Sequence, residues 1–225
     1  MKSTSDRPDL LVFERERWRQ GEIRIAGIDE AGRGPLVGSV VASAVVFSEK
    51  FIEREIKTSF ARLTDSKQIS ETMRESFFAL LQQSDFVEIG VGISSASEID
   101  EINILRATHL AMKRAVEQLS PLPDHILVDG NPVQGLPVLS TSIVKGDSKS
   151  ISIAAASIIA KVTRDHMMYD LDKEHPEYGF AKHKGYGTKL HMETLNKYGP
   201  ISEHRRSFRP VREAASRQPV QMELL

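Results

Sequence analysis

Residues 25–35 read IAGIDEAGRGP, and this stretch sets the framework for the rest of the chain. A β-branched apolar run that suits a half-buried strand leads into two adjacent carboxylates, Asp29 and Glu30. Two buried carboxylates side by side repel each other, so they require a nearby cation or a shared proton. The pattern therefore predicts a strand that carries an acid for metal binding at the point where it leaves the core.

A glycine-flanked arginine follows the two acids. Gly32 and Gly34 lack a Cβ atom, which lets a ligand approach the peptide groups around Arg33 and permits positive φ. Arg33 offers a planar, bidentate donor that suits phosphate. A tight turn with a solvated ion pair is the alternative for an isolated motif of this kind. Acids that occur later in the chain favour the first interpretation, an anion held beside a metal.

The composition of the chain bounds its class. With 225 residues, 40% of them hydrophobic, the chain can bury one sizeable core, with at most a small accessory subdomain. It has no Cys, which excludes disulfides and thiolate metal sites and fits a reducing compartment. No segment resembles a signal peptide or a membrane span. These features predict a soluble, cytoplasmic protein whose metal ligands are carboxylates or histidines.

The net charge is −1, but charge is unevenly placed along the chain. Residues 182–212 hold eight basic residues against two acidic ones, which favours a local basic face for nucleic acid. A solvated carboxy-terminal segment with incidental charge is the alternative. The basic residues are Lys182, Lys184, Lys189, Lys197, Arg205, Arg206, Arg209 and Arg212.

Hydrophobic periodicity predicts alternating strands and helices. Strands are expected near 23–29, 36–47, 86–93, 125–128 and 138–144, with the first two forming a hairpin-like start. Helices are expected at 70–82, 99–119 and 148–173. Alanines 154–156 in the last helix allow close packing on a sheet. The order of the elements predicts an α/β domain with a mixed sheet flanked by helices.

Three acids occupy similar places at the ends of predicted strands: Asp29, Asp129 and Asp147. Oxygen-only ligand sets suit hard cations such as Mg²⁺ or Mn²⁺, which also accept phosphate oxygens. Two such ions can activate an attacking water and stabilise a leaving oxygen, so phosphodiester hydrolysis fits the set. Successive strand side chains point to opposite faces, so Glu30 reaches the same metal only if the chain bends. Otherwise Glu30 acts through its main-chain carbonyl, or its side chain acts from behind the ligands, by contacting them and not the metal.

Seven longer motifs carry a resemblance to a known family. They are DEAGRGP at 29–35, DSK at 65–67, INILRAT at 102–108, VDGN at 128–131, KGDSKSISIAAASIIAKVTRD at 145–165, HKGYGTKLH at 183–191 and GPISEHRRSF at 199–208. Together, over roughly residues 23–212, they resemble bacterial ribonuclease HII, the type 2 ribonuclease H. The resemblance implies a ribonuclease H-like mixed β-sheet flanked by helices, followed by a helical carboxy-terminal region.

The resemblance also implies an activity and a site. The implied enzyme cuts the RNA strand of RNA–DNA hybrids and cuts 5′ of ribonucleotides embedded in duplex DNA, leaving 3′-hydroxyl and 5′-phosphate ends. Its implied cofactors are Mg²⁺ or Mn²⁺, two ions with substrate bound, and its implied role is ribonucleotide removal in DNA repair and replication. The implied catalytic and metal-binding residues are Asp29, Glu30, Asp129 and Asp147. The implied substrate-binding residues are Gly32, Arg33 and Gly34, which sense the ribose 2′-hydroxyl, and Tyr186, which packs on the next deoxyribose. Lys184 beside Tyr186 offers a cation for phosphate.

A mechanistic hypothesis assigns each aspartate a part. Asp29 bridges the two ions, Asp147 helps to hold the ion with the attacking water, and Asp129 supports the leaving-group side. Three alternative functions stay open. Ribonuclease HIII favours a lysine between the glycines and an added amino-terminal domain, a DNA nuclease or resolvase cuts all-DNA duplex, and a hybrid-binding module binds without cutting.

The domain organisation is expected to be simple. Residues 1–20 form a peripheral leader, residues 21–212 the catalytic domain with a helical part from about 166, and residues 213–225 a flexible tail. The terminal sequence Gln221–Leu225 resembles the short peptide by which bacterial replication and repair enzymes dock on the DNA sliding clamp, with an unstructured tail as the alternative. Nothing in the sequence demands more than a monomer.

Overall fold

The computed structural model of the chain describes residues 9–63, 66 and 69–217. The predicted clamp peptide, Gln221–Leu225, lies outside these residues, as do Asp65 and Lys67 of the DSK motif. In chain order the elements are α1 (Val12–Arg19), β1 (Ile25–Ala31), β2 (Val40–Phe47), α2 (Glu49–Glu55), α3 (Glu71–Gln82), β3 (Val87–Ser94), α4 (Ala96–Glu117), β4 (His125–Asp129), β5 (Ser140–Ile143), η2 (Gly146–Ser148), α5 (Ile151–Glu174), α6 (Phe180–His183), α7 (Lys189–Tyr198) and α8 (Arg209–Arg217).

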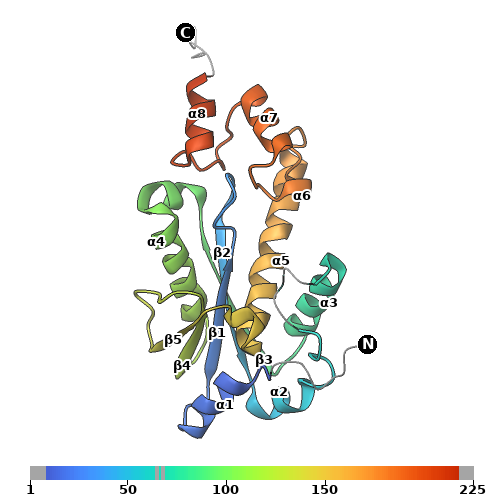
Figure 1. Cartoon of the computed structure of the whole chain (residues 1–225), viewed down its shortest axis with the longest axis vertical. Helices are drawn as coiled ribbons and strands as arrows, with labels where there is room; N and C mark the ends of the chain where they lie inside the picture. The colour runs from blue at the N-terminus through green and yellow to red at the C-terminus, as the bar shows by residue number, and fades with distance from the viewer. Residues whose placement is uncertain (1–8, 64–65, 67–68, 218–225) are drawn as a thin grey trace.

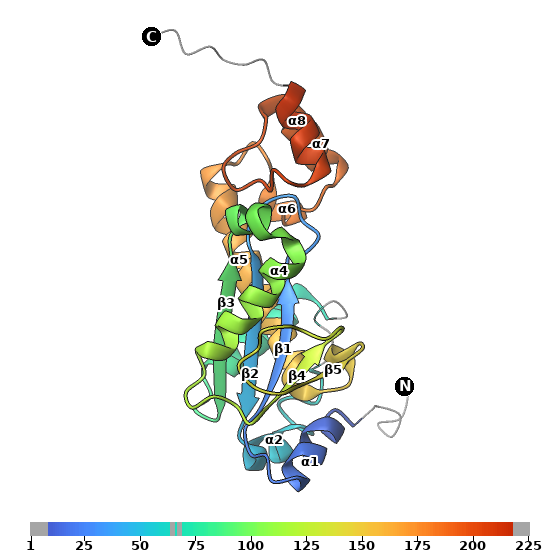
Figure 2. The ribbon, with the colours of Figure 1, turned by 90° about the vertical axis from the view of Figure 1, so that its left-hand side faces the viewer.

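A mixed sheet of five strands, in the order β3-β2-β1-β4-β5, forms the centre of the molecule (Figure 1). β2 pairs antiparallel with both β1 and β3, whereas β4 pairs parallel with β1 and with β5. The predicted hairpin-like start, the mixed sheet and the flanking helices are confirmed. The helical carboxy-terminal region is also confirmed, because α6, α7 and α8 gather at one end of the sheet (Figures 1 and 2).

Helices cover both faces of the sheet, with α4 on one side and α5 on the other (Figure 1). Strand β1 shows how the faces alternate. Its Ala26 and Ile28 pack into the apolar cluster that contains the buried face of α4. Its Gly27 and Asp29 lie toward α5 on the opposite face. The acid is therefore presented to the first turns of α5.

Strand β1 and helix α5 are in close backbone contact at Gly27. A Cβ atom on this residue would lie 2.1 Å from the carbonyl carbon of Ser152 and 2.2 Å from the nitrogen of Ile153. The helix contributes small residues to the same contact, since Ala154–Ala156 are 0% exposed. The predicted close packing of this helix on the sheet is confirmed, and a glycine on the strand makes it possible.

Three elements begin or continue differently from the predictions. The strand expected from residue 36 begins at Val40, because residues 32–39 form a loop. The helix expected at 99–119 has a break at Asn103, where φ is 69° and the side chain accepts hydrogen bonds from the next turn. The helix expected from 148 begins at Ile151, with Ser150 as its N-cap and η2 before it.

The amino-terminal helix is packed into the domain. From the sequence, residues 1–20 are expected to be peripheral, but Leu11 is 0% exposed and Glu14 is 2% exposed. The Oε1 atom of Glu14 accepts hydrogen bonds from the Ser150 hydroxyl at 2.6 Å and the Ser152 N–H at 3.1 Å. Burial raises the pKa of this carboxyl. Helix α1 thus packs against the first turn of α5. The expectation that the residues of this helix are peripheral is wrong.

The carboxy-terminal end of the described chain is also more ordered than expected. The segment expected to be a flexible tail from residue 213 begins inside α8, where Ala214 is 2% exposed. Among the described residues, no helix has the length and apolar character needed to cross a membrane.

Candidate active site

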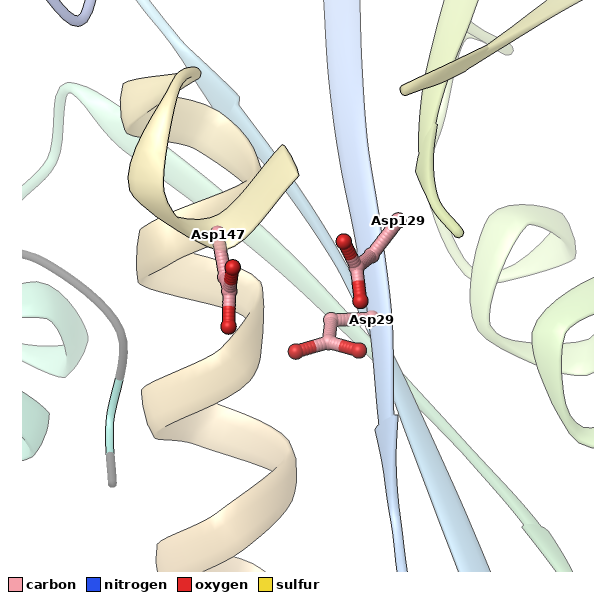
Figure 3. Close-up of side chains that lie close together, drawn as sticks. All are labelled: Asp29, Asp129 and Asp147. Atoms are coloured by element: carbon pink, nitrogen blue, oxygen red, sulfur yellow. The ribbon is translucent and has the colours of Figure 1, made fainter. Parts of the chain in front are cut away.

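Three carboxylates from distant parts of the chain meet beside β1 (Figure 3). Asp29 lies in β1, Asp129 ends the adjacent parallel strand β4, and Asp147 lies in η2 before α5. Each offers an oxygen within 4.8 Å of the other two. The expected position at the end or exit of a strand is confirmed for Asp129, which ends β4, and for Asp147, which follows β5, whereas β1 continues past Asp29 to Ala31.

The environment of Asp29 disfavours its charge. The residue is 7% exposed, and burial raises the pKa of its carboxyl well above the ordinary range. The nearby charges of Glu30 and Asp129 act in the same direction, while the Glu30 N–H, 2.7 Å from Oδ1, and the Ser157 hydroxyl favour the ionised form. A bound cation relieves such crowding of carboxylates.

The turn that carries Asp147 also orients Asp129. The N–H of Gly146 donates a hydrogen bond of 2.6 Å to Oδ1 of Asp129. Lys145, just before it, has φ 56° and reverses the chain in the left-handed region. The main chain next to Asp147 therefore holds the carboxylate of Asp129 in place.

Glu30 is not one of the three carboxylates whose oxygens lie together, although its charge acts on Asp29. Strand β1 keeps its register through this position, with Asp29 opposite Ser43 and Glu30 opposite Ala42. The Glu30 side chain therefore points to the other face of the strand, where Oε1 accepts a hydrogen bond of 3.2 Å from Nη1 of Arg33. Strand β1 therefore does not bend to bring the Glu30 carboxylate to the aspartates, and a role through its main-chain carbonyl or from behind the ligands stays a prediction.

The three aspartates have the chemistry of a site for a hard divalent cation. All of their donor atoms are carboxylate oxygens, which Mg²⁺ and Mn²⁺ prefer. Two of the carboxylates are buried, Asp29 and Asp147, so their ionised forms require compensation. The residues present fit a divalent metal, with Asp29, Asp129 and Asp147 as the side chains that would hold it.

Strand β1 leads directly into the loop of residues 32–39, which we call the GRG loop. Gly32 has φ 96°, and a Cβ there would lie 2.1 Å from Nε of Arg164, so the fold itself requires glycine. At Gly34, by contrast, a Cβ would meet only Cε1 of Tyr186, at an ordinary 3.5 Å. Packing within the described protein leaves Gly34 open on one side.

The structure brings Tyr186 to the GRG loop. Its ring lies beside Gly34, and the Leu36 N–H donates to the Gly185 carbonyl at 2.8 Å. Tyr186 is 48% exposed, so a face of the ring is available. The ammonium group of Lys184 is 3.9 Å from the ring centroid of Tyr169 and donates to the Ala181 carbonyl. Its expected contact with phosphate stays a prediction.

Two buried arginines, Arg164 and Arg205, hold the GRG loop from behind. Arg164 and Arg205 are 1% and 0% exposed, and both donate hydrogen bonds to carbonyls of the loop. The charge pattern predicts Arg205 on an exposed basic face, and this prediction is wrong because the residue is fully buried. The available signal is indirect: an irregular, glycine-rich loop needs donors for its carbonyl groups, and sequence does not show which residue supplies them.

Comparisons with known proteins agree on one family. The family model for ribonuclease HII matches residues 26–211. A ribonuclease HII of Clostridioides difficile (strain 630) is 51% identical over 199 residues, which cover 88% of this chain and 75% of that protein. Among solved structures, the ribonuclease H2 from Pyrococcus horikoshii OT3 has a TM-score of 0.71 at 30% identity and covers 86% of this chain and 98% of its own.

Two further structures are similar in fold. The RNase HII of Archaeoglobus fulgidus, solved in a PCNA:RNase HII complex, has a TM-score of 0.65 at 26% identity, over 81% of this chain and 93% of its own. Bst-RNase HIII, solved in complex with Mn²⁺, has a TM-score of 0.71 at 18% identity, over 97% of this chain and 77% of its own. At that identity the second likeness concerns the fold alone.

Proposed function

Because this chain belongs to the ribonuclease HII family, we propose that it cuts duplex DNA on the 5′ side of an embedded ribonucleotide, leaving 3′-hydroxyl and 5′-phosphate ends. The family makes it a ribonuclease H, which acts on RNA–DNA hybrids. One observation carries the finer proposal. Strand β1 delivers Asp29 to the acidic cluster and runs directly into the GRG loop beside Tyr186.

We infer that Asp29, Asp129 and Asp147 hold Mg²⁺ or Mn²⁺, with two ions present when substrate is bound. Such ions, when bound, activate a water for attack on the phosphodiester and stabilise the leaving oxygen. The all-carboxylate donor set supports this inference. Within the protein, the Glu30 N–H orients Asp29 and the Gly146 N–H orients Asp129.

We infer that the GRG loop and Tyr186 recognise the position at which the strand is cut. The 2′-hydroxyl is the group that distinguishes RNA from DNA, and peptide groups next to glycines can bind it closely. We assign this contact to Gly32, Arg33 and Gly34, and the stacking on the next deoxyribose to the exposed face of Tyr186. The Arg33 guanidinium, held by Glu30, and Lys184 are the cations for the adjoining phosphates.

Cleavage of a duplex that contains one ribonucleotide tests the function. The cut is mapped to single-nucleotide resolution and compared with a long RNA–DNA hybrid and an all-DNA duplex of the same sequence, with Mg²⁺ and with Mn²⁺. We expect one cut, 5′ of the ribonucleotide, and no cut in all-DNA duplex. Cutting of all-DNA duplex would favour a DNA nuclease, and binding without cutting would favour a hybrid-binding module.

Tyr186→Ala is expected to reduce kcat/KM on the single-ribonucleotide duplex by roughly ten- to a hundred-fold, the cost of one lost stacking contact. Tyr186→Phe keeps the ring and most of the activity. Tyr198→Ala is the matched control, because Tyr198 is also 48% exposed but lies on α7. Steady-state kinetics of the three variants, with circular dichroism as a check on folding, measure the effect. Equal rates for Tyr186→Ala and Tyr198→Ala would remove Tyr186 from recognition.

We also propose that Gln221–Leu225 docks on the bacterial DNA sliding clamp. The support is the sequence of the peptide and the structure of the Archaeoglobus fulgidus RNase HII with PCNA. Deletion of residues 219–225 is expected to abolish binding to an immobilised clamp while cleavage of a free single-ribonucleotide duplex is unchanged. Clamp binding that survives the deletion contradicts the proposal.

The remaining parts of the proposed function concern the cell. They are a role in ribonucleotide removal during DNA repair and replication, a cytoplasmic location, and action as a monomer. The domain limits expected from sequence, with catalysis in residues 21–212, also stay a prediction. Ribonucleotide content of the genome in a strain that lacks the protein tests the role, and sedimentation equilibrium tests the monomer.

A further inference from the structure

Seven main-chain carbonyls surround the two buried arginines behind the GRG loop. Arg205 donates four hydrogen bonds, to the carbonyls of Gly32 (2.6 Å), Arg33 (3.0 Å), Pro35 (2.8 Å) and Gly38 (2.9 Å). Arg164 donates three, to those of Val37 (3.1 Å), Ser39 (3.1 Å) and Lys184 (3.0 Å). Together the guanidinium groups hold six of the eight loop residues by their carbonyls.

This use of buried charge is unusual. A fully buried arginine ordinarily pairs with an acid, but within the described residues neither arginine has an acid as hydrogen-bond partner. Burial lowers the pKa of Arg205 to about 9, so the group stays protonated at neutral pH. Its planar fork of donors matches several carbonyls at once, which an ammonium group cannot do.

The captured carbonyls determine where the N–H groups of the loop point. In a trans peptide the C=O of one residue and the N–H of the next point in opposite directions. Because Arg205 holds the carbonyls of Gly32 and Arg33, the N–H groups of Arg33 and Gly34 are turned away from it. In the described part of the chain neither N–H has an acceptor, whereas those of Leu36 and Gly38 donate to Gly185 and Glu203.

We propose that Arg205 is a positioning residue for ribose recognition, which turns the consecutive N–H groups of Arg33 and Gly34 outward as donors for the sugar hydroxyl. This inference rests on the proposed function, since it gives the means by which the GRG loop reads the sugar. The open side of Gly34 and the neighbouring ring of Tyr186 mark the place where the sugar lies. Successive main-chain N–H groups form concave sites that bind anions, and the same donors can bind the oxygen of a hydroxyl.

The test measures recognition separately from cutting. In an Asp29→Asn background, the dissociation constant for a duplex with one ribonucleotide is compared with that for the same duplex made only of DNA. The dissociation constant for all-DNA duplex divided by that for the ribonucleotide duplex, which exceeds one when the sugar is recognised, reports the contribution of the 2′-hydroxyl. Introducing Arg205→Lys is expected to reduce this ratio roughly ten-fold, as for the loss of a well-placed hydrogen bond, while affinity for all-DNA duplex changes little.

Two controls separate positioning from general instability. Leu81→Ala removes a fully buried side chain of α3, far along the chain from the loop, and is expected to lower the unfolding temperature but keep the ratio. Arg206→Lys changes the exposed neighbour of Arg205. This variant is expected to keep both the unfolding temperature and the ratio of dissociation constants. If Leu81→Ala reduces the ratio as much as Arg205→Lys does, the inference is overturned.

The outcomes for the inference and for the proposed function differ. Equal affinity of the Asp29→Asn protein for the two duplexes would contradict ribose recognition itself. A ratio above one that Arg205→Lys leaves unchanged contradicts only the role of Arg205. If Arg205→Lys does not fold, amide resonances of the wild-type protein in EDTA supply the test. Those of Arg33 and Gly34 are expected to shift with the ribonucleotide duplex and not with all-DNA duplex, and the absence of this difference overturns the inference.

Discussion

Asp29→Asn is expected to lower kcat on a single-ribonucleotide duplex by on the order of a thousand-fold, because it removes a charged ligand from the centre of the acidic cluster. Asparagine keeps the shape of the side chain and can still accept the hydrogen bond from the Glu30 N–H. The loss therefore reports the charge and the second carboxylate oxygen. The measurement is kcat across separate titrations of Mg²⁺ and Mn²⁺.

The same substitution is expected to stabilise the metal-free fold. Burial, together with the charges of Glu30 and Asp129, raises the pKa of Asp29 in the folded state. The folded protein thus holds the proton more tightly than the unfolded chain, and stability is lost as pH rises through the folded pKa. Asn cannot ionise, so in EDTA the advantage of the variant in urea unfolding should grow with pH. Added metal should stabilise the wild type more than the variant.

Asp124→Asn is the matched control for this prediction. Asp124 accepts hydrogen bonds from the N–H groups of Ile23 and Arg24 at 2.7 and 2.8 Å, before β4 and outside the acidic cluster. We expect full activity and slightly reduced stability. A folded Asp29→Asn protein with wild-type kcat at saturating metal would show that the three aspartates are not the catalytic centre.

Gly27→Ala is expected to destabilise the fold by about 3 kcal/mol or more, the upper range for a group forced into a packed interior. The added Cβ would lie 2.1 Å from the carbonyl carbon of Ser152, which is main chain and cannot rotate away. Relief requires β1 and α5 to separate, which also moves Asp29 away from Asp147. Urea unfolding measures the loss of stability, and the metal dependence of activity in the folded fraction measures the displacement.

Gly34→Ala makes the same chemical change where there is room. Its Cβ meets only the Tyr186 ring, at 3.5 Å, and its φ is not in the left-handed region. We expect unchanged stability in urea, whatever its effect on substrate. Comparable stability of the two alanine variants would show that the contact between β1 and α5 adjusts freely.

The elements that periodicity predicts are those whose neighbours lie in the same sheet or on the same helix face. Leu36 and Val37 show where this information stops. Their apolar character extends the predicted strand back to residue 36, and both are buried. They belong to apolar clusters of the carboxy-terminal region, however: Leu36 shares one with Leu195, and Val37 shares one with Tyr178. A sequence pattern reports burial but does not name the surface that covers it.

In the candidate site, too, some features can be predicted from the sequence and others cannot. The three aspartates and the odd position of Glu30 are predictable, because motif order and the two-residue period of a strand are local properties. The structural roles of Glu14 and Arg205 cannot be predicted from the sequence. Glu14 acts on hydroxyls 136 or more positions away, and Arg205 acts on carbonyl groups, which every residue carries. No residue type in the loop marks it as the partner of an arginine.

The bond between Arg205 and the carbonyl of Arg33 spans 172 positions of the chain, and this has a consequence for biosynthesis. The loop leaves the ribosome well before the guanidinium that holds it. Asp29, Asp129 and Asp147 have all been made by then. A nascent chain that stops short of residue 205 therefore carries its acids without a fixed loop. In each round of synthesis, the loop is held in place only after the three acids have been made.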